Sequence, residues 1–159
     1  MSPVVDRAAT DGSIARGVAR RPVLVVDDEP HIGRIISAKL TQGPFDVTLV
    51  TSGRAARDAL ASDRPLALLI LDLMMPDVSG FDVLHAARND PRRQTLPCIV
   101  LTALGQDSVA HGLASLGISE FMTKPFSPRR LYARALALTD TAFAPASDVP
   151  SSTPLEPTE

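Results

Sequence analysis

The chain has 159 residues, of which 45% are hydrophobic and 21% are charged, and its formal net charge is −2. This composition is that of one ordinary globular domain with tails, and it excludes a fibrous repeat and a chain that is disordered throughout. The small net charge gives no reason to expect direct binding to nucleic acid, and no apolar run is long enough to predict a membrane span.

The two ends of the chain differ in composition from the middle. Residues 1–21 carry four arginines against two aspartates and lack a sustained apolar period, so we expect a mostly disordered basic arm. Residues 141–159 contain four prolines and no lysine or arginine, which predicts a disordered acidic tail or linker. The folded domain is therefore expected within residues 22–140.

Five short apolar runs in this middle part alternate with longer segments of helical character, which is the pattern of βαβ units around a parallel sheet. The first, third and fourth runs are apolar almost throughout, as strands covered on both faces should be. The expected strands are residues 22–26, 45–50, 66–71, 98–101 and 120–122.

Helices are expected to follow each of these strands. Pro30 lies in the first turn of the first helix, and Ser127 is positioned to cap the last one. The expected helices are residues 30–40, 54–61, 81–88, 108–116 and 128–138. Cys98 opens an apolar strand, where it is most simply a core residue, and a single cysteine without a disulfide partner is typical of a cytoplasmic protein.

Polar side chains follow four of the five strands at the point where each strand ends. Asp27 and Asp28 follow the first strand, Asp72 the third, Thr102 the fourth and Lys124 the fifth. Because parallel strands end at the same edge of a sheet, these side chains are expected to meet in the crevice where open α/β sheets bind ligands. The second strand contributes no such residue, which fits an outer position. The predicted fold class is thus α/β, a doubly wound, flavodoxin-like, five-stranded parallel sheet of order 2-1-3-4-5 with helices on both faces.

Three carboxylates at one edge repel one another, by roughly 4 kcal/mol for a pair about 4 Å apart at an effective dielectric constant of about 20. A single lysine ammonium cannot neutralise all three. A few hard oxygen ligands with room for water and phosphate suit Mg²⁺ better than Ca²⁺. A carboxylate beside a metal, a lysine and a hydroxyl is equipped to attack a phosphoryl group.

Residues 22–140 resemble the receiver domain of two-component response regulators. The resemblance depends on the order and spacing of four strings, VLVVDDEP, LLILDLMMPDVSGFDVL, IVLTAL and GISEFMTKPF. It implies a cytoplasmic protein that takes a phosphoryl group from a sensor histidine kinase or a histidine phosphotransfer protein, with Mg²⁺ as cofactor. Such a domain assists its own phosphorylation but turns over no separate substrate, so it is not an enzyme in the usual sense.

The resemblance also implies a role for each polar residue. Asp72 would be the phosphoacceptor, and Asp28, Asp72 and the backbone carbonyl of Met74 would bind Mg²⁺, with Asp27 acting directly or through water. Lys124 would pair with the phosphoryl oxygens.

A second group of residues would carry the switch that the family implies. Thr102 would donate its hydroxyl to the phosphoryl group, and Phe121 would occupy the switch-aromatic position. The Lys124–Pro125 peptide would be cis. Phosphorylation would then change the face formed by the fourth helix, the fifth strand and the fifth helix. The identity of the kinase, the downstream target and a phosphorylation-dependent homodimer stay open.

The sequence departs from the commonest family pattern in several places. Residues 117–119 read Gly-Ile-Ser where Gly-Ala-Asp is frequent, and Phe121 replaces a frequent Tyr, so a switch must work by ring packing alone. Met74 and Leu104 occupy the two positions thought to govern the approach of water to the phosphoryl group. Both are bulky and apolar, and we therefore hypothesise a long-lived acyl phosphate.

Other interpretations of the same residues have to be weighed. Residues 27–29 could simply cap the helix that begins at Pro30. A haloacid-dehalogenase-type phosphatase would carry its nucleophile in an Asp-x-Asp string after the first strand, where this chain reads Asp-Asp-Glu. A phosphorylation-independent interaction module would lack one of the acidic or lysine positions, and none is missing.

The remaining charged residues are expected to be surface groups. Arg92 and Arg93 are interpreted as a solvated loop, and the arginines at positions 129, 130 and 134 as the solvated face of the last helix. The three histidines, at positions 31, 85 and 111, lack metal-ligand spacing. No output domain is recognisable after residue 140, and the linker-like tail leaves open whether the chain is a stand-alone receiver or part of a longer protein.

Overall fold

The structure, a computed structural model, describes residues 19–103 and 112–140. The strands are β1 (Arg21–Val26), β2 (Phe45–Val50), β3 (Leu68–Asp72), β4 (Cys98–Thr102) and β5 (Glu120–Thr123). The helices are α1 (Pro30–Leu40), α2 (Gly53–Ala61), α3 (Gly80–Asn89), the 3₁₀ turn η1 (Ala114–Leu116) and α5 (Pro128–Asp140).

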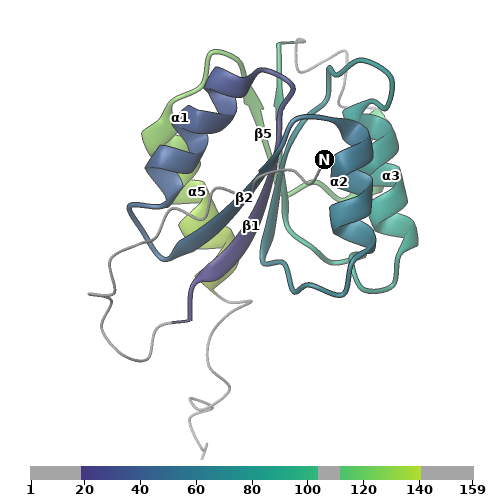
Figure 1. Cartoon of the computed structure of the whole chain (residues 1–159), viewed down its shortest axis with the longest axis horizontal. Coiled ribbons are helices and arrows are strands. Elements are labelled where there is room, and N and C mark those ends of the chain that lie inside the picture. The colour runs from purple at the N-terminus through teal and green to yellow at the C-terminus, as the bar shows by residue number, and fades with distance from the viewer. Residues whose placement is uncertain (1–18, 104–111, 141–159) are drawn as a thin grey trace, which may run out of the picture.

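The strands form one parallel sheet of order β2-β1-β3-β4-β5. Helices α1 and α5 cover one face of the sheet, and α2 and α3 cover the other (Figure 1). The predicted fold class is therefore confirmed, including the strand order and the helices on both faces. None of the described helices combines the length and the apolar character that crossing a membrane requires.

The core consists of two apolar layers separated by the sheet. Side chains alternate along a strand, so Val23 and Val25 of β1 face one layer while Leu24 and Val26 face the other. Every residue of β3 and β4 is buried. The unbroken apolar runs in these two segments predicted this, because they are typical of parallel strands covered on both faces.

Serine side chains accept hydrogen bonds from backbone amides in the first turn of α2, α3 and α5. Ser79 and Asp82 form a reciprocal capping box at the start of α3, and Ser52 accepts a hydrogen bond from the Ala55 amide at the start of α2. Ser127, the expected cap of the last helix, accepts from the Arg130 amide at 3.3 Å.

Several boundaries differ from the predicted ones by one or two residues. Strand β3 begins at Leu68 instead of residue 66, because its pairing with β1 begins at the Val23–Leu68 pair. Strand β1 begins at Arg21, whose guanidinium donates to Thr139 Oγ1 at 2.9 Å and to Asp140 Oδ1 at 2.8 Å. This contact attaches the first strand to the end of the last helix.

Some predictions concern residues outside the described part of the chain. These are residues 1–18 of the arm, residues 141–159 of the tail, Leu104, and residues 108–111 of the helix expected at 108–116. The remainder of that helix ends in the 3₁₀ turn η1, and Gly117 follows it with a φ of 64°, a conformation that glycine adopts without strain.

The expectation that Arg92 and Arg93 both lie in a solvated loop is wrong for Arg93. Its side chain is buried and donates hydrogen bonds to the carbonyl oxygens of Leu60, Ser62 and Arg64 at 3.0, 2.9 and 2.7 Å. A guanidinium can be buried here because the last turn of α2 and the loop after it supply carbonyl oxygens as acceptors.

Candidate functional site

The first two carboxylates lie in the turn that connects β1 to α1. Asp27 is fully buried, its amide donates to Val50 O at 3.2 Å, and its Oδ1 accepts from the Glu29 amide at 2.9 Å. Asp28 is half-buried. The hydrogen bond from the Glu29 amide fixes the turn before α1, whose N-cap residue, Glu29, makes no side-chain capping hydrogen bond.

Asp72 is the last residue of β3, and the backbone after it is held tightly. The Met74 amide donates to Asp72 Oδ1 at 3.0 Å, and the Gly80 amide donates to Leu73 O at 3.0 Å. A Cβ atom at Gly80 would collide with the backbone of Asp72 and Leu73, so only glycine allows α3 to begin this close to the carboxylate.

Lys124 follows β5 and reaches two of the three carboxylates. Its Nζ lies 3.1 Å from Asp72 Oδ2 and 2.9 Å from Asp27 Oδ2. Its amide donates to Thr102 O at 2.8 Å, and the Lys124–Pro125 peptide bond is cis. One ammonium group therefore bridges residues that are far apart in the sequence.

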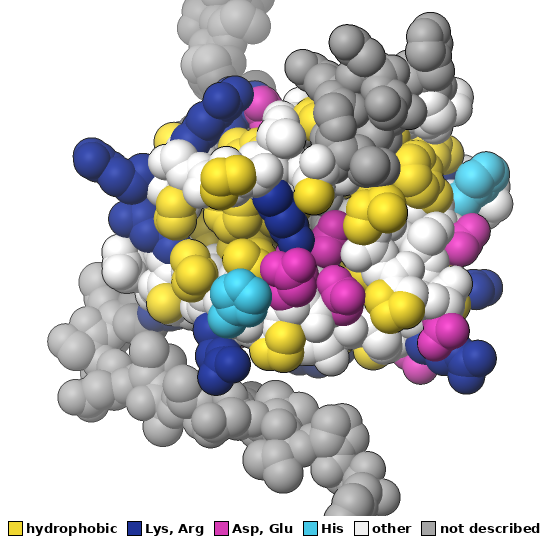
Figure 2. All heavy atoms as spheres, turned by 90° about the horizontal axis from the view of Figure 1, so that it is seen from above, with side chains coloured by type: hydrophobic (Ala, Val, Ile, Leu, Met, Phe, Trp, Pro, Cys, Tyr) yellow, Lys and Arg dark blue, Asp and Glu magenta, His cyan; other side chains and the backbone are white. Residues whose placement is uncertain are grey.

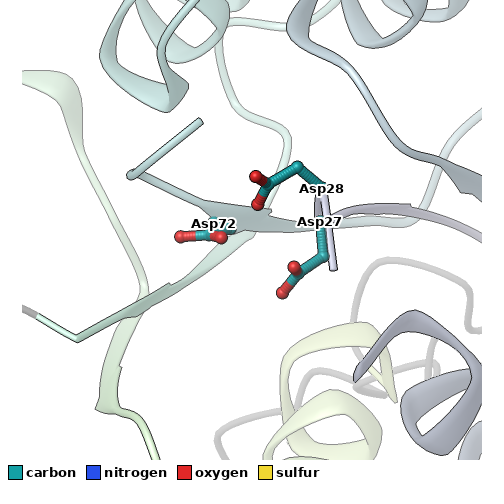
Figure 3. A group of neighbouring side chains, drawn as sticks. All are labelled: Asp27, Asp28 and Asp72. Carbon is teal, nitrogen blue, oxygen red and sulfur yellow. The ribbon is translucent and has the colours of Figure 1, made fainter. Parts of the chain in front are cut away.

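The three aspartates gather at the edge where the strands end. Asp27, Asp28 and Asp72 each offer a carboxylate oxygen, and these three oxygens lie within 4.8 Å of one another (Figure 3). Figure 2 views this edge from above and shows acidic side chains beside a basic one, with hydrophobic side chains around them. The three aspartates therefore lie together at the carboxyl edge of the sheet, as expected from the ends of the parallel strands.

The pKa values of Asp72 and Lys124 are shifted by burial and by their mutual contact. Burial raises the pKa of Asp72, and the hydrogen bonds from the Met74 amide and Lys124 offset this only in part. Burial alone would lower the pKa of Lys124, but its hydrogen bonds and charge interactions with Asp27 and Asp72 outweigh that effect and raise it. The two shifts show a carboxylate whose ionised form is disfavoured by burial and an ammonium that its two carboxylate partners keep charged.

Thr102 and Phe121 lie on β4 and β5, the two strands at the end of the sheet beyond β3. Thr102 ends β4, is fully buried and pairs with Thr123 in the register of the sheet. Phe121 is half-buried and packs against the apolar layer under α2 and α3. It also lines a surface pocket of about 480 Å³.

One arginine of α5, Arg130, lines that pocket together with Glu120 of β5. Glu120 of β5 forms ion pairs with Arg130 at 3.4 Å and with Arg134 at 2.8 Å. Two of the α5 arginines that were expected to be solvated therefore form ion pairs with β5.

Two features of the site were not foreseen from the sequence. The backbone carbonyl of Met74 was the expected contribution of that residue, yet its amide also positions the Asp72 carboxylate. Lys124 was expected to meet the phosphoryl oxygens, and here it pairs with Asp27 as closely as with Asp72. The Asp-Leu-Met string at residues 72–74 was the one available signal for the first feature.

Comparisons with known proteins agree on one family. The family model described as "Response regulator receiver domain" matches residues 23–136. The "DNA-binding dual master transcriptional regulator RpaA" of Synechocystis is 38% identical over 117 residues, which are 73% of this chain and 48% of that protein. "Response regulator PleD" of Caulobacter vibrioides is 38% identical over 118 residues, 74% of this chain and 26% of that protein.

A solved structure, the receiver domain of the Francisella response regulator 1452, has the same fold. It is 29% identical, superposes with a TM-score of 0.69, and the match covers 77% of this chain and 99% of that one. The chain spans about half, or less, of the length of the curated relatives named above.

Proposed function

Since the chain belongs to the response regulator receiver domain family, we propose that Asp72 accepts a phosphoryl group from a phosphohistidine on a sensor histidine kinase or a histidine phosphotransfer protein. The observation that carries this proposal is the position of the Lys124 ammonium, 3.1 Å from Asp72 and 2.9 Å from Asp27 at the carboxyl edge of the sheet. In this position, the positive charge of Lys124 lies beside the Asp72 carboxylate, which is the proposed nucleophile.

The residues present fit a Mg²⁺ ion. Asp27, Asp28 and Asp72 offer hard oxygen ligands within 4.8 Å of one another, and Lys124 is the cation that pairs with two of them, Asp27 and Asp72. We propose Asp28, Asp72 and the Met74 carbonyl as ligands, with Asp27 acting directly or through water. The bound ion would supply charge neutralisation at the phosphoryl oxygens.

The proposed chemical step needs little from the protein beyond position and charge. An Asp72 carboxylate oxygen attacks phosphorus, the phosphorus–nitrogen bond of the phosphohistidine breaks, and its electron pair returns to the imidazole, which takes up a proton. Lys124 stabilises the negative charge on the phosphoryl oxygens. The product is an acyl phosphate on Asp72, and no separate substrate is turned over.

We further propose that the acyl phosphate acts through Thr102 and Phe121. The Thr102 hydroxyl would bind the phosphoryl group. The Phe121 ring, on β5 two residues before Thr123, would then repack against the apolar layer under α2 and α3. The affected face would include β5 and α5. A cytoplasmic location, a protein target on this face and a phosphorylation-dependent dimer belong to the same proposal.

The lifetime of the acyl phosphate follows from its surroundings. Met74 is apolar and close to Asp72, and an apolar side chain cannot orient an attacking water molecule. With Leu104 as the second apolar residue, we expect a long-lived acyl phosphate. A half-life of seconds in Mg²⁺ buffer would contradict this expectation.

The deciding experiment is incubation with acetyl phosphate and Mg²⁺ followed by intact-mass measurement. Wild type should gain one phosphoryl group and Asp72→Asn none, whereas Asp58→Asn, which changes an exposed aspartate on α2, should behave like wild type. Phosphate on Asp72→Asn would move the acceptor elsewhere. No phosphate on any of the three proteins would favour the phosphorylation-independent module.

Neither alternative gains support from the comparisons. The haloacid dehalogenase type would use a nucleophile after the first strand, and the family that matches this chain is the receiver domain. Size-exclusion chromatography with beryllofluoride, a phosphoryl mimic, tests the dimer separately.

A further inference from the structure

The methionines near the proposed phosphoacceptor differ sharply in exposure. Met74 is 52% exposed, while Met75 beside it is 8% and Met122 of β5 is 5% exposed. Met74 and Ile35 are the large hydrophobic side chains that stand exposed in the part of the chain that the structure describes. An exposed thioether two residues after the reactive carboxylate is chemically distinct from an exposed aliphatic side chain, because its sulfur can be oxidised.

Met74 is tied to the proposed phosphoacceptor through its backbone. It follows Asp72 by two residues in the loop after β3, and its amide donates a hydrogen bond to Asp72 Oδ1 at 3.0 Å. Leu73 and Met75 on either side are buried, so within residues 72–75 the exposed side chain is that of Met74. The group at position 74 is therefore the exposed side chain attached to the segment that holds the carboxylate.

The other sulfur near the sheet is protected from oxidation. Cys98 is fully buried, and burial raises the pKa of its thiol to about 12, so the reactive thiolate is absent at neutral pH. Met75 and Met122 are shielded by the core. Among the described residues, the thioether of Met74 is the sulfur that a dissolved oxidant meets first.

From this contrast we propose that Met74 is a redox modification site that controls how long the phosphoryl group stays on Asp72. A hydroperoxide, hydrogen peroxide being the simplest, transfers one oxygen atom to the sulfur: the sulfur–oxygen bond forms, the oxygen–oxygen bond breaks, and water leaves. The inference rests on the proposed function of Asp72.

The expected consequence follows from the change in polarity. An apolar thioether cannot hold water beside the acyl phosphate, whereas a sulfoxide oxygen is a strong hydrogen-bond acceptor. One added hydrogen bond to the attacking water corresponds to about a twofold to tenfold faster hydrolysis. Oxidation would thus shorten the signal, and methionine sulfoxide reductase would restore its lifetime.

The first test maps oxidation on the protein before phosphorylation. A limiting dose of hydrogen peroxide followed by peptide mass analysis should show oxygen on Met74 ahead of Met75 and Met122. Equal oxidation of the three methionines, or oxidation of Met75 first, would overturn the proposal.

The second test measures acyl-phosphate decay by intact mass in Mg²⁺ buffer, with and without peroxide. Peroxide should speed decay of wild type by about twofold to tenfold, leave the decay rate of Met74→Leu unchanged from its own untreated value, and act on Met75→Leu as on wild type. Met74→Gln, which carries a polar acceptor permanently, should decay faster than Met74→Leu without peroxide.

The outcomes separate the two proposals. If untreated wild type acquires no phosphoryl group, the proposed function fails and the inference fails with it. If wild type is phosphorylated and peroxide leaves its decay rate unchanged although Met74 is oxidised, the inference alone is wrong.

Discussion

The two edges of the sheet both contain buried charged side chains, and the surroundings of these charges differ. At the carboxyl edge, Asp27 and Asp72 share one ammonium group, and burial leaves the pKa of Asp72 raised. At the opposite edge, the Arg93 guanidinium donates to three carbonyl oxygens in the last turn of α2 and the loop after it. A fully hydrogen-bonded charge stabilises the fold, while carboxylates in excess of their cation favour a ligand that supplies positive charge.

The largest expected effect tests the structural edge. Arg93→Met should lower the free energy of unfolding by about 2–4 kcal/mol, because it leaves the buried Leu60 carbonyl and the part-buried Ser62 and Arg64 carbonyls without this donor. Chemical denaturation measures the change. Arg92→Met is the matched control: its side chain is 45% exposed and its ion pairs lie at the surface, so its loss should be much smaller. Equal losses for the two variants would contradict the assignment of Arg93 as a structural group.

The next effect tests the carboxyl edge. Without metal, Lys124→Gln should lower the free energy of unfolding by roughly 1–3 kcal/mol, because two buried carboxylates lose their shared cation. Lys39→Gln, which changes the other lysine of the chain, serves as the control. If Lys124→Gln were as stable as wild type, the bridge at this edge would be of no consequence for folding.

Mg²⁺ should distinguish the two edges directly. At ten times its dissociation constant, a ligand that binds only the folded state raises the free energy of unfolding by about 1.4 kcal/mol. Thermal melts of wild type should therefore shift upward with Mg²⁺ and return with EDTA. The shift should shrink in Asp72→Asn and persist in Arg93→Met; a shift of the same size in Asp72→Asn would argue against the proposed ligand set.

The smallest expected effect is an increase in the free energy of unfolding, whereas most substitutions of buried residues lower it. Because the pKa of Asp72 is raised above its ordinary value of 3.8 in the fold, its ionisation opposes folding, and metal-free Asp72→Asn should be slightly more stable than wild type at neutral pH. The difference should widen as the pH rises through the raised pKa and vanish toward lower pH. Urea titrations at several pH values measure it, and a constant difference would rule out this electrostatic origin.

Much of the fold could be predicted because its signals are local. The apolar runs of β3 and β4 mark covered parallel strands, and polar residues directly after four strands indicate a shared site. The start of β3 at Leu68 could not be predicted, since it depends on the partner residue Val23 in another strand. The burial of Arg93 was missed for the same reason, because its acceptors lie about thirty residues away, at the end of α2 and in the loop after it.

The sequence by itself determined the parallel α/β architecture and the set of residues at the carboxyl edge, because periodicity and strand ends are properties of short segments. Only the tertiary structure decided that one lysine bridges Asp27 and Asp72, and that Met74 is exposed while Met75 is buried. Distances and exposure of this kind depend on how segments far apart in the chain pack together, and no local pattern encodes them.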